Sequence, residues 1–101
     1  RYLKQSTLEY RRRRDQLSTL LVTRLGDRID FRVPDGGLAI WTRWPENFNL
    51  LRYSRECAAQ GLHIPHYLLY QSQSIAGIRM GFGSLSLPDI ETVVNIMASV
   101  R

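Results

Sequence analysis

The sequence predicts an α+β fold, a two-layer sandwich in which a small, mainly antiparallel sheet carries its helices mostly on one face. Three patterns lead to this expectation: an amphipathic stretch over residues 2–25, a hairpin pattern over residues 29–44 and a capped helix that begins after Ser86. The 101 residues, 44% of them hydrophobic, suit a single domain with one modest core. No apolar run approaches the roughly 20 residues of a membrane-spanning helix, so we expect no membrane partner and a cytoplasmic location.

The first element is expected to be one long helix over residues 2–25. Its stripe recurs at spacings of four and three and comprises Leu3, Thr7, Tyr10, Arg14, Leu17, Leu21 and Leu25, with Gly26 as the C-cap. The stripe is weak in its first half, so we expect the second half to pack on the domain and the first half to project or to pack on something absent. A chain that begins inside a helix without a capping residue is typical of a fragment of a longer protein.

The net positive charge of the chain belongs to its first segment. Residues 1–28 carry eight basic and three acidic side chains, whereas residues 29–101 carry six of each. The run Arg11–Arg14 spreads over most of the helix circumference and therefore makes no single patch. Two i,i+4 ion pairs are expected, Glu9 with Arg13 and Arg11 with Asp15. A solvated, partly paired helix is the favoured interpretation, and a contact with a phosphate backbone is the alternative.

The next segment is expected to fold as an antiparallel hairpin over residues 29–44. Apolar residues alternate with polar ones from Ile29 to Val33. Pro34–Gly37 then has the composition of a turn, and residues 38–44 return as the second strand.

A short helix is expected over residues 50–60. Asn49 is placed to cap its start, and Gly61 lies just past its end. The inner face of this helix is expected to consist of Leu50, Leu51, Ser54, Cys57 and Ala58.

Two strands separated by a loop are expected between this helix and the last one. Residues 62–64 are expected to form a short strand, residues 67–74 a polar loop, and residues 75–83 the second strand. His63 and His66 stand three positions apart, but no cysteine or carboxylate lies nearby in sequence to complete a ligand set, so no metal site is expected.

The last helix has the clearest start signal in the chain. Ser86-Leu87-Pro88-Asp89 matches a capping box with proline in the first turn, where its missing N–H costs little. The core-facing stripe is expected to be Ile90, Val93, Val94 and Met97. The element order is then helix, strand, strand, helix, strand, strand, helix.

Arg79 is the candidate functional residue. It lies between Gly77 and Gly81 on one face of its strand, while the other face carries Ile78, Met80 and Phe82. Glycines weaken a strand, so two of them beside an arginine indicate that something approaches the backbone closely there. A carboxylate held by both arms of the guanidinium fits such a place. The alternative is an arginine on a solvated sheet face beside two bulge-forming glycines.

The sequence holds no familiar catalytic motif. It contains no nucleophile elbow, no HExxH motif and no P-loop. Gly81–Ser86 starts like a dinucleotide-binding fingerprint, but it lacks the third glycine and the acidic residue about 20 positions later.

Three segments resemble one known family, the fold-type I pyridoxal-phosphate (PLP) aminotransferases. Pro34–Trp41 is similar to the P-x-G-G-hydrophobic-x-hydrophobic-Trp segment that opens their small C-terminal domain. Ile78–Leu85 is similar to the strand whose arginine binds the substrate α-carboxylate, and its Gly-Phe-small-Ser-Leu ending is most like the MocR subgroup of GntR-type transcription regulators. Tyr10–Leu17 is similar to the basic stretch of the helix that leads from the large domain to the small one.

This resemblance covers essentially the whole chain and implies roles for its parts. It implies that residues 1–101 form the small C-terminal domain of an aminotransferase-like protein, with residues 1–25 as the helix that leads from the missing large domain. Arg79 would bind the carboxylate of an amino-acid effector or substrate. The other implied partners are that large domain, a second copy in a homodimer, and DNA through an absent N-terminal domain. Pro65-His66-Tyr67 departs from the usual Pro-Gly-aromatic segment, so the loop that faces the substrate is expected to differ in shape.

The resemblance also implies which groups lie elsewhere. The cofactor lysine of the family, the aspartate paired to the pyridine nitrogen and the phosphate-binding residues all belong to the large domain. The only lysine here is Lys4, near the start of a basic helix, where nothing would hold it against a cofactor or lower its pKa. We therefore expect PLP in the full-length protein, but neither a cofactor nor catalysis in this fragment alone.

Two functions of the parent protein stay open, and a third interpretation is more distant. The favoured one is a MocR/GntR-type regulator that responds to an amino acid, and a winged helix-turn-helix upstream of the large domain would mark it. The nearest alternative is a genuine PLP-dependent aminotransferase that acts on 2-aminoadipate or on a broad range of amino acids. The distant alternative is a stand-alone nucleic-acid-binding module that uses Arg11–Arg14 and binds with a steep salt dependence.

Overall fold

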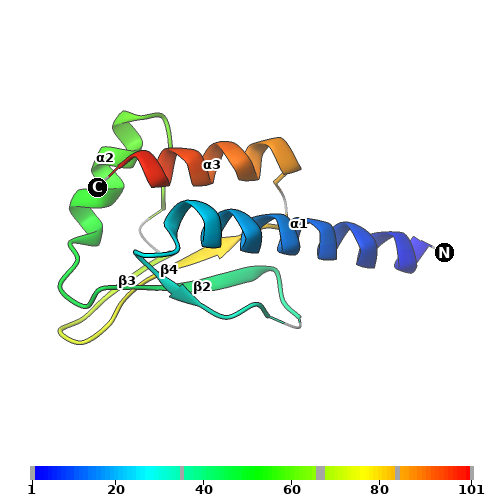
Figure 1. Ribbon diagram of the computed structural model, residues 1–101, viewed down its shortest axis with the longest axis horizontal. Coiled ribbons are helices and arrows are strands. Elements are labelled where there is room, and N and C mark those ends of the chain that lie inside the picture. The colour runs from blue at the N-terminus through cyan, green and yellow to red at the C-terminus, as the bar shows by residue number, and fades with distance from the viewer. Residues whose placement is uncertain (1, 35, 66–67, 84, 101) are drawn as a thin grey trace.

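The computed structural model describes residues 2–34, 36–65, 68–83 and 85–100, with side chains from residue 7 onward. Its elements are α1 (Tyr2–Leu25), β1 (Asp30–Phe31), β2 (Ala39–Trp44), α2 (Leu50–Ala59), β3 (Leu69–Gln71), β4 (Ala76–Gly81) and α3 (Leu87–Ser99). The four strands form one antiparallel sheet in the order β1-β2-β4-β3. α1 and α3 run side by side over one face of this sheet, and α2 lies near one end (Figure 1). The predicted α+β class and element order are confirmed.

The centre of the sheet is the long pairing of β2 with β4. All six residues of β4 have a partner in β2, from Trp44 opposite Ala76 to Ala39 opposite Gly81. β3 is shorter and pairs only with Ala76–Ile78. In the described part of the chain, Arg79–Gly81 therefore have a neighbouring strand on the β2 side alone.

The core lies between the sheet and the two long helices. The strands contribute Ile40, Ile78 and Met80, and Phe82 joins them just after the end of β4. The helix α1 contributes Leu17, Leu20, Leu21 and Leu25, and α3 contributes Ile90, Val94 and Met97. Deletion of one large side chain from such a core typically costs about 2–5 kcal/mol, because the cavity left behind is only partly refilled.

The two halves of α1 differ as the weak and strong parts of its stripe predicted. Leu17, Leu21 and Leu25 are buried, whereas Leu8 is half exposed. Figure 1 shows the N-terminal turns extending beyond the sheet. Gly26 does not adopt the left-handed conformation of a glycine C-cap. A Cβ at Gly26 would overlap the carbonyl oxygen of Val22, so close packing of the chain requires glycine at this position.

The ion pairs predicted along α1, Glu9–Arg13 and Arg11–Asp15, are wrong. Glu9 instead lies 3.7 Å from Arg12, and Asp15 lies 3.0 Å from Arg14. Residues three apart on a helix are neighbours as much as residues four apart, so spacing did not decide the partner of Glu9. Asp15 pairs with the adjacent Arg14, a contact that the spacing rule does not anticipate.

The hairpin is confirmed, with a shorter first strand than predicted. Asp30 pairs with Arg43, and Phe31 pairs with Thr42. Gly37 has a φ of 82°, the left-handed conformation that the turn requires. Asp35, the remaining turn residue of the prediction, lies outside the described residues.

Both predicted N-terminal helix caps are present. The Asn49 side chain accepts a hydrogen bond from the backbone N–H of Arg52 at 3.0 Å, and the Ser86 hydroxyl oxygen accepts one from Asp89 N–H at 3.2 Å. Each bond satisfies a first-turn donor that the helix itself leaves free.

The predicted inner face of α2 is partly wrong. Leu51 and Ala58 are exposed, and the buried residues are Leu50, Tyr53, Ser54 and Cys57. Tyr53 escaped the prediction, although its spacing fits the stripe. Its burial is possible because its hydroxyl group donates a 2.6 Å hydrogen bond to the Met97 carbonyl oxygen, which satisfies the polar end of the ring.

The third strand lies elsewhere than predicted. Residues 62–64 form no strand, and β3 falls at Leu69–Gln71, inside the predicted loop. Leu62 N–H donates to the carbonyl oxygen of Cys57, so its backbone closes the end of α2 and is not available to a sheet.

None of the helices in the described part of the chain combines the length and apolarity that a membrane crossing requires.

Candidate carboxylate-binding site

Arg79 lies on β4 and is exposed on the face of the sheet that turns away from α1 and α3. Its neighbours Ile78 and Met80 are buried on the helix face, as the alternation predicted. Directly opposite Arg79 in the register is Trp41 of β2. The packed neighbours therefore hold the Arg79 backbone in place while its side chain remains outside the core.

The two glycines that flank Arg79 have different surroundings. The ring of Trp41 lies over Gly77, where an added Cβ would overlap it. At Gly81 an added Cβ would find its nearest heavy atom 3.7 Å away, at the Leu38 carbonyl oxygen. The close approach predicted beside Arg79 is thus made at Gly77 by the protein's own tryptophan, and the packing does not account for a glycine at position 81.

The surface around Arg79 is aromatic and basic. Trp41 is 44% exposed and Tyr70 is 52% exposed, and the two rings meet edge to face with centroids 6.3 Å apart. Arg43 is also exposed and lies opposite Gly77 on β2. Arg79 has no ion pair within the described residues, so its planar fork of N–H donors is available to an anion.

Arg79 also borders a cavity of about 210 Å³. The cavity lies where β4 has passed beyond β3, between the strand, the segment after α2 and the helix α3. Its described lining residues are Leu62, His63, Ile64, Pro65, Leu68, Ile78, Arg79, Met80, Gly81, Leu85, Val93 and Met97.

Two arginines of the basic run contact the loops that follow the strands. Arg13 donates to the carbonyl oxygen of Gly83, and Arg14 donates to that of Pro34, both at 3.4 Å. Tyr10, on the same side of α1, packs on Phe82 with ring centroids 5.3 Å apart. The middle of α1 thus braces the end of the Arg79 strand, a role that the charge pattern alone did not suggest.

A second cationic cluster is structural. The Arg28 guanidinium lies 5.5 Å from the ring centroid of Trp44 and 5.6 Å from that of Tyr53, and it donates to the Met97 carbonyl oxygen at 3.4 Å. Burial raises the pKa of Tyr53 and also the pKa of the Cys57 thiol. Both groups are therefore neutral near pH 7, and Cys57 lacks the thiolate that a nucleophile needs.

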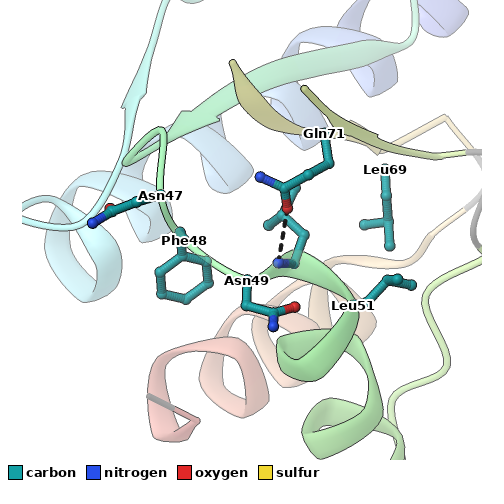
Figure 2. Close-up of a pocket in the computed structure, with 7 residues that line it drawn as sticks. Asn47, Phe48, Asn49, Leu51, Leu69 and Gln71 are labelled. Atoms are coloured by element: carbon teal, nitrogen blue, oxygen red, sulfur yellow. Dashed lines mark hydrogen bonds between the residues drawn. The ribbon is translucent and has the colours of Figure 1, made fainter. Parts of the chain in front are cut away.

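A wider hollow of about 510 Å³ lies at the start of α2, lined by Asn47, Phe48, Asn49, Leu50, Leu51, Leu69 and Gln71 (Figure 2). Gln71 reaches from β3 to the first turn of α2, where its side-chain oxygen accepts a 3.1 Å hydrogen bond from Leu50 N–H. Asn49 accepts from Arg52 N–H as well, so two N–H donors of this helix end already have side-chain partners. No charged side chain lines the hollow among the described residues, so it offers no cation to pair with a carboxylate.

The described residues contain no cluster of three His, Cys, Asp or Glu side chains that would hold a metal ion. His63 lines the cavity beside Arg79, and His66 lies outside the described residues.

The residues around Arg79 do not fit a PLP group on their own. A Schiff base requires a lysine, and Lys4, the only lysine of the sequence, belongs to the N-terminal turns of α1 that extend beyond the sheet in Figure 1. The described surroundings of Arg79 therefore do not include the lysine that a Schiff base with PLP requires.

Comparisons with known proteins agree with the fold. No family model matches the sequence. The chain is 28% identical over 86 residues to the uncharacterized HTH-type transcriptional regulator YisV of Bacillus subtilis (strain 168), a match that covers 85% of this chain and 18% of the relative.

Solved structures of aminotransferases are similar to about nine-tenths of the chain. An aspartate transaminase from Corynebacterium glutamicum matches with a TM-score of 0.78 and 14% identity over 94% of this chain and 24% of its own. LysN, the alpha-aminoadipate aminotransferase of Thermus thermophilus, matches with a TM-score of 0.75 and 13% identity over 90% of this chain and 24% of its own. The chain spans about a quarter or less of these relatives. It therefore has the fold of an aminotransferase small domain, and its sequence is similar to that of an HTH-type transcriptional regulator, which confirms the resemblance drawn from its motifs.

Proposed function

We propose that residues 1–101 are the small C-terminal domain of a MocR/GntR-type transcriptional regulator and that Arg79 binds the carboxylate of its amino-acid effector. The observation that carries this proposal is the placement of Arg79, which is exposed and without an ion pair in the described chain, yet is anchored between two buried residues of a central strand. The aminotransferase fold and the similarity to a transcriptional regulator support it.

The chemistry of the site suits a carboxylate. The planar guanidinium presents parallel N–H groups that match both oxygens of a carboxylate, which gives orientation as well as attraction. The indole of Trp41, the residue opposite Arg79 in the register, lies over Gly77 on the same face. In the parent protein, residues outside this chain would hold PLP, which supplies the group to which the amine of the ligand can attach.

The proposal is tested with Arg79→Ala in the full-length protein. Loss of a charge-assisted pair of this kind should weaken amino-acid binding by about 2–5 kcal/mol, at least thirtyfold in affinity. Calorimetry measures the affinity, and the absorbance change of bound PLP gives a second readout. Arg43→Ala, which removes an exposed arginine from the same face, is the matched control and should change little. An affinity that Arg79→Ala leaves unchanged would remove Arg79 from the site.

A genuine aminotransferase is the second candidate. The observation that favours it is the breadth of the structural similarity, which includes an aspartate transaminase and an alpha-aminoadipate aminotransferase. The two candidates differ in a direct assay, because an aminotransferase moves the amino group of an amino acid to an oxo acid. The regulator instead binds DNA through its N-terminal domain and changes that binding when the amino acid is present. Both would occupy the cytoplasm as homodimers.

A further inference from the structure

The two edges of the sheet, β1 and β3, differ in composition. The β1 edge carries Asp30, and Arg32 and Pro34 follow it; charges and proline are common means of preventing a further strand from pairing with an edge. The β3 edge has neither, since residues 68–74 include no charged side chain and no proline. The composition of β3 therefore does not oppose the addition of a short strand.

The outer edge of β3 presents backbone groups without partners. The Ser72 N–H donates to the Ile75 carbonyl oxygen at 2.8 Å, which shows which residue pairs of β3 and β4 are hydrogen-bonded. Bonded and non-bonded pairs alternate in an antiparallel ladder, so Tyr70 directs its N–H and C=O groups toward β4. Those of Leu69 and Gln71 consequently point outward, and no described residue forms a hydrogen bond with them.

The hollow at the start of α2 lies along this edge. Its volume of about 510 Å³ is within the range of about 300–1,000 Å³ that is usual for binding pockets. Leu69 and Gln71 form its β3 wall, and Leu51 lies on the α2 side (Figure 2). Leu51 is 49% exposed, whereas its neighbour Leu50 is buried. An apolar group in the hollow would remove the Leu51 side chain from water, which is favourable.

The polar groups of the hollow are uncharged. The side-chain oxygens of Asn49 and Gln71 accept hydrogen bonds from N–H groups of α2, and their NH₂ groups donate to no described residue. A charged ligand group there would lose water without gaining an opposite charge from the described lining. Outward N–H and C=O groups at every second residue, beside an apolar wall, are the features with which a sheet edge binds an extended peptide.

We propose that the β3 edge and this hollow bind an extended, uncharged segment of a partner protein, which adds a strand to the sheet. The backbone of the segment bonds to Leu69 and Gln71, and one apolar side chain lies in the hollow against Leu51. Leu69 is opposite Ile78 and shares its helix face, whereas Arg79 is exposed on the other face. The inference is therefore independent of the carboxylate role proposed for Arg79.

The test is calorimetric titration of the full-length protein with four capped five-residue peptides. Each has threonine, which favours the extended conformation, at its four outer positions, and leucine, phenylalanine, aspartate or lysine at its centre. The leucine or the phenylalanine peptide should bind at least roughly tenfold more tightly than the charged ones, because an apolar pocket penalises a buried charge. Equal affinities for all four, or no binding of either apolar peptide at about 1 mM, would overturn the inference.

Hydrogen exchange shows whether the peptide adds as a strand. With the leucine peptide bound, the amide hydrogens of Leu69 and Gln71 should exchange at least about tenfold more slowly, because each gains a bond. The Tyr70 amide, already directed toward β4, is the internal control. An added strand turns only alternate N–H groups toward β3, so N-methylation of one of two adjacent central residues of the peptide should abolish binding and methylation of the other should not. Unslowed exchange, or equal losses from both methylations, would contradict strand addition.

A charge placed in the wall locates the peptide side chain. Leu51→Asp should weaken the leucine peptide at least about tenfold and strengthen the lysine peptide, whose ammonium gains a partner. Aspartate is favourable in the first turn of a helix, so α2 should still form. Leu8→Asp makes the same change at a leucine of α1 that is 52% exposed, and it should leave both affinities unchanged. Peptide binding that Leu51→Asp does not alter lies elsewhere. Self-association that Leu51→Asp abolishes, without peptide binding, would make the occupant a second copy of the chain and overturn the inference.

Discussion

The two faces of β4 differ in what surrounds them. On the helix face, Ile78 and Met80 are buried, as is Phe82 just after the end of the strand. On the opposite face, Arg79 is exposed beside the half-exposed ring of Trp41. A period of two residues lets one strand do both, because the packed face fixes the backbone from which the exposed face projects. The position of the Arg79 backbone is therefore fixed by the packing of its neighbours on the opposite face.

The largest effect is expected where the packed face is broken. Phe82→Ala should lower the free energy of unfolding by about 3–5 kcal/mol, because Phe82 is fully buried and its loss leaves a cavity beside Tyr10. Urea-induced unfolding measures the change. Tyr70→Ala on the exposed face is the control and should cost about 1 kcal/mol or less. Similar losses for both variants would contradict the difference between the faces.

A smaller effect is expected at Gly77, where the Trp41 ring packs closely on the exposed face. Gly77→Ala should cost about 1–3 kcal/mol, because its Cβ would overlap the Trp41 ring and force that ring to move. The cost should largely disappear in a Trp41→Ala background, and unfolding of the two single variants and the double variant measures this coupling. Additive costs would show that Trp41 does not set the identity of residue 77. Gly81→Ala, without an overlap, is the matched control.

The smallest effect concerns pH and the interior behind the packed face. Burial raises the pKa of the Cys57 thiol, so the folded protein retains that proton above the pH at which the unfolded chain releases it. The resulting stability is complete below the ordinary thiol pKa of 9.0 and declines as the pH rises through the folded value. The slope is at most about 1.4 kcal/mol per pH unit.

Unfolding free energies measured from pH 7 to pH 10 test this, and Cys57→Ala should flatten the decline. Tyr53, whose pKa burial also raises, adds to the decline only above the ordinary tyrosine pKa of 10.0. Thiol reagents should label Cys57 far more slowly in the folded than in the unfolded protein. Equal labelling rates would mean that the thiol is accessible in the folded state.

Local signals predicted most of the fold. The stripe of α1, the hairpin turn, the caps at Asn49 and Ser86 and the alternation around Arg79 each depend on residues close together in sequence, and each is present. The misplaced third strand depends on a distant partner, because residues 69–71 become a strand only by pairing with β4. No local pattern carries that information.

The candidate site was predictable only in part. Arg79 stood out between its glycines, but the ring that covers Gly77 comes from β2 and required the register between the strands. The cavity wall at Val93 and Leu62 likewise joins segments about thirty residues apart in sequence. The stacking of Arg28 on Trp44 and Tyr53 has the same origin, since each ring comes from a different element.

The short third strand also bears on how copies of this domain avoid one another. An uncovered strand edge is a template on which another chain can add a strand, and long, flat, apolar edges of this kind aggregate. Among the described residues, the part of β4 that β3 leaves unpaired is limited to Arg79–Gly81, and it carries a positive charge and a glycine. Two copies that met edge to edge would bring two guanidinium groups together, and like charges repel. Arg79, the residue proposed to bind a carboxylate, thus also disfavours edge-to-edge pairing between two copies of the domain.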